Sequence, residues 1–374
     1  MVPSIQRNSC YFVLIIARMA LVAAGLAAVA GADTVTEPLM EFGYRSLSSN
    51  VAYSPDGSKF LAGFQDGKTR LFDINTGAVI RTFTEYNRQV NSVAFSPDGT
   101  KALTGIGEYT DTYHGYAKLW NAVTGEEIRT FTDELTPWVT SVAFSPDGTK
   151  VLTGAWDMTA KLWDAATGGL IRTFAGHTDY VNAVAFSPDG TKVLTGSRDG
   201  TAKLYDAATA AVICTLTGHG FGLRSVAFSP DGTKVLTNSE PDTAKLWNAA
   251  TGALIRTFTD DLTYPEFSSV NSVAFSPDGT KVLIGSSTWT AKLLDAATGA
   301  VIRTFTGYKA SVDSVTFSPD GSKVLTGSGM VLDGSGDETV KLWDAATGAE
   351  IRSFSANLGY VQCVAFSPDG TKIM

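Results

Sequence analysis

The sequence has few charged residues and very little cysteine or histidine. Of its 374 residues, 18% are charged, and it contains three cysteines and three histidines. With 44% hydrophobic residues and 37 glycines, this composition excludes a disordered chain, a coiled coil and a basic nucleic-acid-binding arm. Cys10, Cys214 and Cys363 show no Cys-x-x-Cys spacing, and the histidines are scattered, so we expect neither a disulfide scaffold nor a zinc site.

Positive charge is also scarce, and the formal net charge is −8. Residues 1–30 contain two arginines and no acid, so without them 27 Lys and Arg stand against 37 Asp and Glu, a net charge of −10. A chain this acidic repels phosphate backbones. We therefore expect no nucleic-acid partner.

Residues 1–30 have the pattern of a signal peptide. Arg7 and Arg18 precede the uncharged apolar run of residues 19–30, and small residues around Ala30 offer a cleavage site. This pattern predicts export to the periplasm or the medium, with no stable membrane insertion after cleavage. The alternative is an uncleaved membrane anchor over residues 11–31, but Arg18 interrupts that span at a cost of about 2.5–3.5 kcal/mol.

The rest of the chain, residues 36–374, is one unit repeated eight times, which leaves no room for a second domain. The marker is Ser-Pro-Asp-Gly, at intervals of 42 to 49 residues. Its copies begin at Ser54, Ser96, Ser145, Ser187, Ser229, Ser276, Ser318 and Ser367.

Each copy predicts four short β-strands. In the fourth copy these are residues 181–186, 192–197, 201–206 and 211–216, rich in Val, Ile, Thr and Phe and separated by turn residues. Pro presets φ and Gly accepts a positive φ, so Ser-Pro-Asp-Gly closes the first hairpin and Asp-Ala-Ala-Thr-Gly the third. Four-stranded sheets repeated at this period form a β-propeller, so the fold class is all-β.

Two dipeptides give the repeat a family resemblance. Gly-His precedes the first strand at Gly176-His177 and Gly218-His219, and Trp-Asp ends the third strand at Trp163-Asp164 and Trp343-Asp344. The chain resembles the WD40 repeat family over about residues 36–374. In that family a His, a Ser or Thr, an Asp and the Trp of one repeat form a hydrogen-bonded tetrad. The nearest match in this chain has Tyr in the Trp position: His177, Thr195, Asp199 and Tyr205.

The number of ring positions is open at this stage. Seven complete copies are followed by a partial eighth, which contains the apolar segment 361–366 and ends at Met374. We favour an eight-position ring whose incomplete last blade is finished by an N-terminal strand at Pro38–Phe42. A seven-bladed ring with a loose tail is the alternative.

The two faces of the predicted propeller differ. The Ser-Pro-Asp-Gly and Asp-Ala-Ala-Thr-Gly turns, which define the turn face, are nearly identical between copies. The connections from second to third strands and from fourth to first strands define the loop face, and every length change falls there. Loops on a rigid frame commonly carry recognition.

Aromatic residues and one arginine mark the loop face as a candidate partner-binding surface. Tyr, Trp and Arg are enriched at binding hot spots. An alternative is that these side chains only pack against neighbouring loops. The candidate residues are Tyr109, Tyr113, Trp138, Trp156, Tyr180, Arg198 and Phe221.

The other recurring polar residues have structural explanations. The backbone conformation of the Ser-Pro-Asp-Gly turn is sufficient to explain its Asp, so we expect no metal site. A row of arginines on the fourth strands, such as Arg256, is interpreted as protection of exposed edges. Cys214 replaces Arg in that row, and we expect Cys214 and Cys363 to be unpaired.

The sequence gives little support for catalysis. His114 is the one histidine that the repeat does not explain. The sequence contains no glycine-rich phosphate loop, no nucleophile motif and no metal-ligand spacing. We therefore expect a monomeric, non-catalytic interaction scaffold without a cofactor, which binds a protein partner through the loop face. A small-ligand or carbohydrate binder using the same aromatics is the alternative, and a propeller enzyme comes third.

Overall fold

The computed structural model describes most of the repeated part of the chain. The described residues are 48–64, 67–73, 76, 78–84, 89–107, 115–132, 138–239, 243–259, 270–328, 339–355 and 363–373. They belong to the second of two units into which the chain divides, Met1–Thr34 and Val35–Met374. The described residues form β-strands and turns without a helix, so no apolar helix that could cross a membrane occurs among them.

The strands form seven four-stranded antiparallel sheets, each made of four strands consecutive in the chain. The first four sheets are β1 (Ser48–Tyr53), β2 (Lys59–Phe64), β3 (Lys68–Asp73) and β4 (Val79–Thr84); β5 (Gln89–Phe95), β6 (Lys101–Gly107), β7 (Tyr116–Asn121) and β8 (Glu127–Phe131); β9 (Val139–Phe144), β10 (Lys150–Ala155), β11 (Ala160–Asp164) and β12 (Leu170–Phe174); and β13 (Val181–Phe186), β14 (Lys192–Ser197), β15 (Ala202–Asp206) and β16 (Val212–Leu216).

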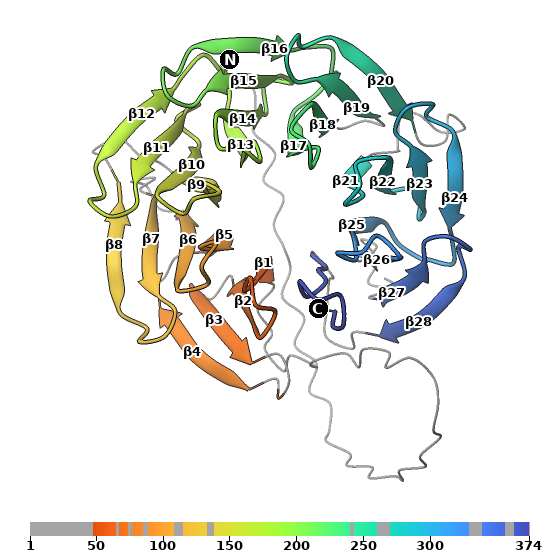
Figure 1. Ribbon diagram of the computed structural model, residues 1–374, viewed down its shortest axis with the longest axis horizontal. Helices are drawn as coiled ribbons and strands as arrows, with labels where there is room; N and C mark the ends of the chain where they lie inside the picture. Colours follow the sequence, from red (N-terminus) through yellow and green to blue (C-terminus); the bar gives the residue numbers. More distant parts are fainter. Residues whose placement is uncertain are drawn as a thin grey trace, which may run out of the picture. The chain divides into compact units, whose positions relative to one another are not determined.

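The remaining three are β17 (Leu223–Phe228), β18 (Lys234–Ser239), β19 (Thr243–Asn248) and β20 (Leu254–Thr259); β21 (Val270–Phe275), β22 (Lys281–Ser286), β23 (Ala291–Asp295) and β24 (Val301–Phe305); and β25 (Val312–Phe317), β26 (Lys323–Ser328), β27 (Thr339–Asp344) and β28 (Glu350–Ser355). These seven blades are arranged in a ring, with the first strand of each innermost and the fourth outermost (Figure 1). The fold is a seven-bladed β-propeller. The prediction of an all-β propeller is confirmed, and the four strands expected in the fourth copy differ from β13–β16 by at most one residue.

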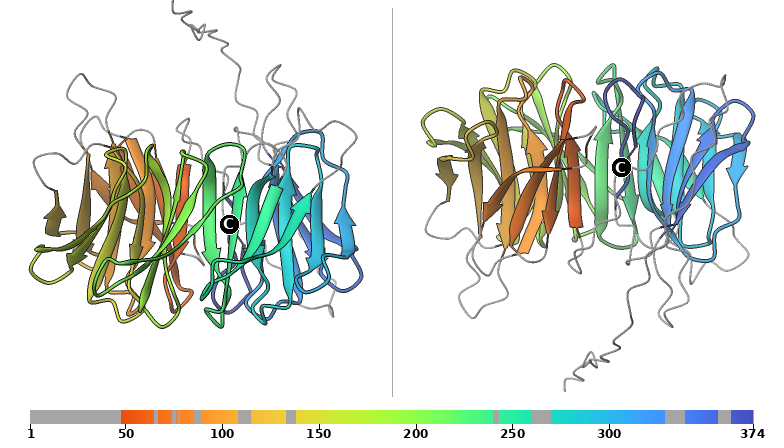
Figure 2. Two further views of the ribbon diagram at one scale, coloured as in Figure 1. Left: turned by 90° about the horizontal axis from the view of Figure 1, so that it is seen from above. Right: turned by 90° about the horizontal axis from the view of Figure 1, so that it is seen from below.

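The turn face is uniform and the loop face is not. Five residues separate the first strand from the second, and five separate the third from the fourth, in every blade. On the loop face, three to ten residues separate the second strand from the third, and four to ten lead from one blade to the next. Figure 2 shows the strands running between these two faces.

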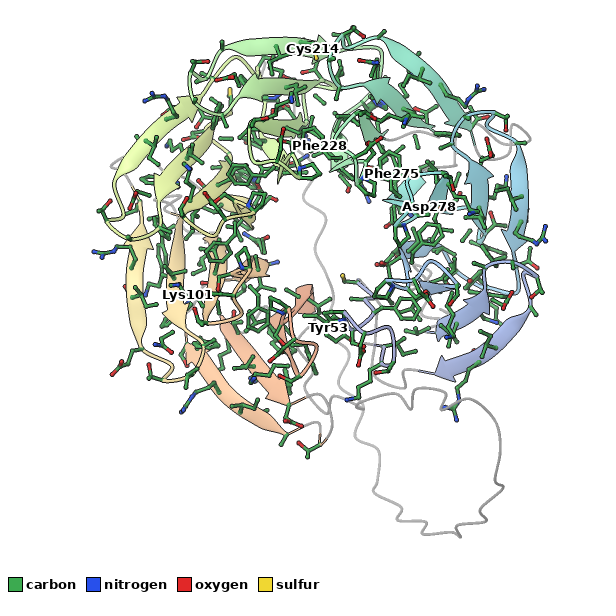
Figure 3. The ribbon with its side chains drawn as sticks, viewed as in Figure 1. Tyr53, Lys101, Cys214, Phe228, Phe275 and Asp278 are labelled. Atoms are coloured by element: carbon green, nitrogen blue, oxygen red, sulfur yellow. The ribbon has the colours of Figure 1, made fainter. Side chains whose placement is uncertain are left out.

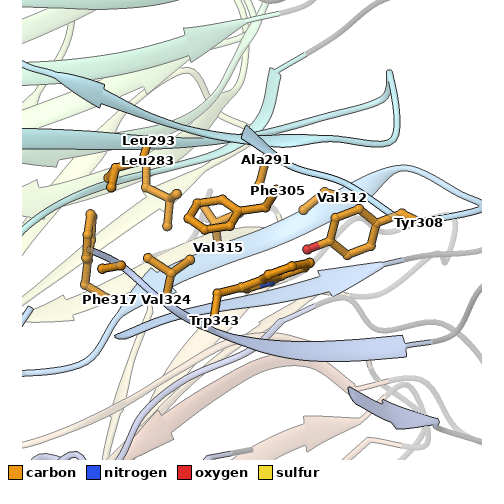
Figure 4. Packing of buried hydrophobic residues seen from close by; sticks show 11 residues of the cluster. Leu283, Ala291, Leu293, Phe305, Tyr308, Val312, Val315, Phe317, Val324 and Trp343 are labelled. Carbon is orange, nitrogen blue, oxygen red and sulfur yellow. The ribbon is translucent and has the colours of Figure 1, made fainter. Parts of the chain in front are cut away.

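The core lies between neighbouring blades. Second strands are buried on both sides, whereas fourth strands bury mainly one residue, such as Phe305 at the end of β24. Phe305 packs against Trp343 of the next blade at 5.2 Å between ring centroids, with Tyr308 6.0 Å from the same indole ring (Figure 4). Apolar burial between sheets thus joins the blades into one body.

Each Ser-Pro-Asp-Gly turn is held by its own side chains. In the turn from Ser187, the Gly190 amide donates to the Ser187 carbonyl at 2.8 Å. The Asp189 carboxylate accepts the Ser187 hydroxyl at 2.5 Å and the Thr191 amide at 3.0 Å, and these hydrogen bonds lower its pKa to about 2. The same contacts recur from blade to blade, which explains the repeated aspartate without a metal ion.

Residues 363–373 lie between the seventh blade and the first. Val364, Phe366 and Ile373 are buried against Leu325 and Leu342. On the other side, the Tyr53 hydroxyl reaches the Ala365 carbonyl at 3.5 Å (Figure 3).

This segment has one isolated β-bridge, between Phe366 and Ile373. An eighth four-stranded sheet is therefore not formed within the described part of the chain. The proposed N-terminal strand, Pro38–Phe42, lies outside the described residues, so completion of an eighth blade by that strand stays a prediction.

The arginines of the fourth strands join neighbouring blades. Five of them donate from the guanidinium to a backbone carbonyl in the turn between the third and fourth strands of the next blade, as Arg81 Nη2 does to Val123 at 2.7 Å. The other pairs are Arg129 with Ala166, Arg172 with Ala208, Arg256 with Ala297, and Arg303 with Ala346. The sequence interpretation, protection of exposed strand edges, does not account for these contacts. It considered each blade separately, whereas the arginines bind the next blade.

One seam lacks this contact. Cys214 replaces the arginine on β16 at the outer rim (Figure 3), and its side chain lies against Gly252 of the next blade. Gly252 and Gly125 hold the same place in their turns. A methyl group added at Gly252 would lie 3.1 Å from Cys214 Sγ, and one added at Gly125 would lie 3.2 Å from Arg81 Cδ, so Cys214 occupies the place of the arginine. Cys214 and Cys363 are both free, as predicted, and burial raises the pKa of the Cys214 thiol.

We expect Cys214→Arg to stabilise the protein. The new guanidinium would reach the Ala250 carbonyl, the counterpart of Ala166 and Ala208, and add about 0.5–1.5 kcal/mol to the free energy of unfolding. Urea denaturation measures the change. Arg256→Ala is the matched variant, because it removes the corresponding contact with Ala297 and should lower the free energy of unfolding. A Cys214→Arg variant that is less stable than the parent would contradict this role.

Candidate functional site

Four of the candidate side chains form one continuous stack on the loop face. The rings of Trp138 and Trp156 lie 4.6 Å apart with planes inclined by 7°, and Trp156 and Tyr180 lie 4.5 Å apart at 9°. The Arg198 guanidinium lies 5.8 Å from the Tyr180 ring centroid, within cation–π distance. The structure thus brings these four candidate residues into contact with one another.

The backbone sets the order of this stack. Trp138 directly precedes β9 and Trp156 directly follows β10, so both belong to one blade, and the Trp156 amide donates to the Trp138 carbonyl at 3.2 Å. Tyr180 and Arg198 hold the same two places in the next blade, joined by the Arg198 amide and the Tyr180 carbonyl at 2.8 Å. The contact between Trp156 and Tyr180 then crosses the boundary between blades.

Two glycines allow the ends of the stack to pack closely. A methyl group at Gly107 would lie 2.5 Å from the Trp138 ring, and one at Gly222 would lie 2.8 Å from Arg198 Cα. Both distances are too short for any side chain. Neither glycine stood out in the sequence, because their role depends on contacts between different blades.

The faces of the stacked rings are occupied and one end of the stack is exposed. Trp138 is buried, Trp156 and Tyr180 are partly buried, and the Arg198 side chain is 63% exposed. Arg198 also lies 4.0 Å from an Asp179 carboxylate oxygen. Local packing, the alternative interpretation, thus describes the tryptophans, while Arg198 remains accessible to a partner.

The other candidates lie apart from the stack or outside the described residues. Phe221 is 64% exposed and precedes Gly222, whose Cα faces Arg198. Tyr109 and Tyr113, like His114, lie outside the described residues. The binding role of the whole set remains a prediction.

The tetrad-like residues of the fourth blade form a partial network. His177 Nδ1 lies 2.8 Å from an Asp199 carboxylate oxygen and His177 Nε2 lies 2.7 Å from the Thr195 hydroxyl. Burial lowers the pKa of His177, although Asp199 opposes that shift. Tyr205 donates instead to the Ala175 carbonyl at 3.1 Å, and burial raises its pKa to about 12.

The fifth blade contains a more complete network than the sequence suggested. His219 Nε2 and Trp247 Nε1 both contact the Thr237 hydroxyl, at 2.7 and 2.8 Å. Ser239 takes the place of the missing Asp, with its hydroxyl 2.7 Å from His219 Nδ1. Burial lowers the pKa of His219 to about 4, so the ring is neutral at neutral pH. These contacts are structural, because each polar atom of the imidazole is used inside the blade.

Three further blades keep part of the network. Trp120 donates to Thr104 at 3.1 Å and Trp163 donates to Thr153 at 3.0 Å. In the seventh blade the Tyr308 hydroxyl replaces the histidine and lies 2.5 Å from the Thr326 hydroxyl. Buried Trp–Thr hydrogen bonds therefore occur in four described blades, the fourth of them from Trp343 to Thr326 at 3.0 Å.

The described residues do not assemble a metal centre. No group of three or more His, Cys, Asp or Glu side chains that could hold a metal ion occurs among them. The one described carboxyl group whose pKa burial raises, Asp313, accepts a hydrogen bond from Asn271 Nδ2 at 2.9 Å. It thus has a local structural partner.

Comparison with known families agrees with this architecture. The family model described as "WD domain, G-beta repeat" matches six segments, residues 77–121, 125–164, 168–206, 211–248, 254–295 and 299–344. The chain therefore belongs to the WD40 repeat family, whose propellers are typically protein-interaction scaffolds and generally non-catalytic. No curated protein matches the chain.

Proposed function

We propose that the protein is a non-catalytic scaffold that binds a protein partner through the loop face. The observation that carries this proposal is the difference between the faces: connections on the turn face are always five residues long, whereas those on the loop face vary from three to ten. A rigid frame with constant turns on one face and variable loops on the other is suited to recognition by the variable loops.

The geometry of the stack supports a protein partner over a carbohydrate. A sugar ring packs on a free aromatic face, but Trp156 has a neighbouring ring on each side, and Tyr180 lies between Trp156 and Arg198. The accessible groups are the Arg198 guanidinium and the Phe221 ring. An arginine beside an aromatic residue is a frequent hot-spot composition at protein interfaces.

Affinity capture with loop-face variants tests this function. We expect Arg198→Glu combined with Phe221→Ser to weaken capture of the partner at least about tenfold, because both side chains are exposed and carry contact area. Val123→Ser is the matched control, since Val123 is an exposed apolar residue in the β7–β8 turn of the opposite face. A partner that binds the double variant as well as the parent, and loses binding with Val123→Ser, would place the site on the turn face.

We further infer that the protein acts outside the cytoplasm. The support is the sequence of residues 1–30, with its two arginines, apolar run and small residues near Ala30. We expect the exported protein to begin near Gly31 or Asp33, and N-terminal sequencing of material from the periplasm or medium measures this. A chain that keeps Met1 and stays with the membrane fraction would support the anchor instead.

A further inference from the structure

Charged residues are rare on the innermost strands of the ring. Of the seven strands β1, β5, β9, β13, β17, β21 and β25, only β17 and β25 contain a charge, as Arg224 and Asp313. Both hold the inner position, which we define as the residue five places before the serine of each Ser-Pro-Asp-Gly turn. This position lies near the loop face, because each first strand follows a loop-face connection (Figure 1).

The inner position has a structural role in three other blades. There its side chain donates a hydrogen bond to the backbone carbonyl at the first residue of the next innermost strand. The three contacts are Asn91 Nδ2 with Val139 at 2.9 Å, Thr140 Oγ1 with Val181 at 2.5 Å, and Asn182 Nδ2 with Leu223 at 2.9 Å. A neutral hydrogen-bond donor at the inner position thus joins neighbouring blades.

Arg224 is not needed to join the fifth blade to the sixth. Asn238 of β18 makes that contact instead, since its Nδ2 donates to the Val270 carbonyl at 2.9 Å. Asn238 is fully buried, and its Oδ1 accepts the Ser225 amide at 2.8 Å. The other six blades have glycine at the place of Asn238, as at Gly196. Arg224 is exposed, so its charge needs an explanation other than blade joining.

Asp313 departs from the joining pattern as well, because an ionised carboxylate cannot donate a hydrogen bond. It accepts Asn271 Nδ2 at 2.9 Å, from the blade that lies between it and Arg224. Burial raises the pKa of Asp313, while a hydrogen bond from Ser311 and the positive charge of Arg224 oppose that shift. Arg224 and Asp313 are therefore close enough to interact electrostatically across one intervening blade.

We propose that Arg224, Asn271 and Asp313 form a binding site for a small zwitterion that carries a carboxylate and an ammonium group. The Arg224 guanidinium binds the carboxylate of the ligand, because its planar set of N–H donors matches the two carboxylate oxygens. The Asp313 carboxylate binds the ammonium group, and Asn271 holds that carboxylate in place. This inference does not depend on the proposed protein partner.

Isothermal titration calorimetry of the full chain tests the ligand class. The probes are glycine, β-alanine, 4-aminobutyrate and 6-aminohexanoate, in which the two charges lie progressively farther apart. We expect at least one of them to bind with a stoichiometry of one. Acetate and methylamine should bind at least about tenfold more weakly than that probe, because each lacks one of the two charged contacts. Equal binding of either ion, or no binding of any zwitterion, would overturn the inference.

Two charge-neutralising variants test the assignment of residues. Arg224→Gln and Asp313→Asn keep the approximate size of each side chain, and the amide oxygen of the second variant can still accept from Asn271. We expect each to weaken binding of the selected zwitterion at least about tenfold, with a melting temperature like that of the parent. Lys192→Gln is the matched control, because Lys192 begins β14 at the turn face and should bind the zwitterion like the parent. Unchanged affinity in either of the two variants would contradict the proposed site.

Discussion

Removal of residues 363–374 is expected to lower the free energy of unfolding by about 4–9 kcal/mol. Val364, Phe366 and Ile373 are almost fully buried against the seventh blade, and each buried side chain of this size contributes about 1.5–3 kcal/mol. The same deletion takes away the contact between Ala365 and Tyr53 of the first blade. The ring then loses the segment that lies between its first and last blades, and guanidinium denaturation measures the loss.

Two milder variants keep this prediction testable if the truncated chain does not fold. Phe366→Ala removes one buried ring and is expected to cost about 3–5 kcal/mol. Deletion of residues 33–44 tests whether Pro38–Phe42 pairs with the C-terminal segment, as the sequence predicts, and would then cost several kcal/mol through lost burial. An unchanged melting temperature after that deletion would favour the seven-bladed ring without an N-terminal strand.

Thr237→Val is expected to cost about 2–4 kcal/mol, although valine has nearly the same shape as threonine. The Thr237 hydroxyl is the shared contact of His219 Nε2 and Trp247 Nε1 inside the fifth blade. Valine would leave both ring nitrogens without that partner, and each buried polar group left unsatisfied costs about 1–3 kcal/mol.

Thr153→Val is the matched control for this network. Thr153 is buried at the same place in the third blade, where its hydroxyl accepts the Trp163 indole N–H, and residues 138–174 of that blade include no histidine. We expect about half the loss seen for Thr237→Val, measured by urea denaturation of both variants. Equal losses would show that the imidazole contributes nothing through Thr237.

The sequence predicts the blades well because each blade is a local structure. Strands, their order and the hairpin turns depend on neighbouring residues, so the pattern from Val181 to Leu216 predicts β13–β16 almost residue by residue. Contacts between blades depend on residues about forty positions apart. The joining role of Arg81 and its counterparts could not be predicted, because their carbonyl partners belong to the next repeat.

The candidate site shows the same division. The position of Trp138, Trp156, Tyr180 and Arg198 on the loop face follows from the repeat alone. Their continuous stack also needs the contact between Trp156 and Tyr180, which belong to different blades. Ser239 could replace the expected Asp because its hydroxyl comes from the end of β18 rather than from the following turn. The positive φ of Trp289 could not be predicted from its own residue type. The one indication in the sequence is that another blade has a glycine, Gly200, at the corresponding place.

Photo-crosslinking tests the central claim, that partners bind the loop face, most directly. A photoreactive phenylalanine analogue replaces Phe221 on the loop face in one protein and Val123 on the turn face in another, since both side chains are well exposed. We predict that the partner crosslinks from position 221 and not from position 123. Crosslinking from position 123 alone would contradict the account, because it would assign recognition to the face whose turns are the same in every blade.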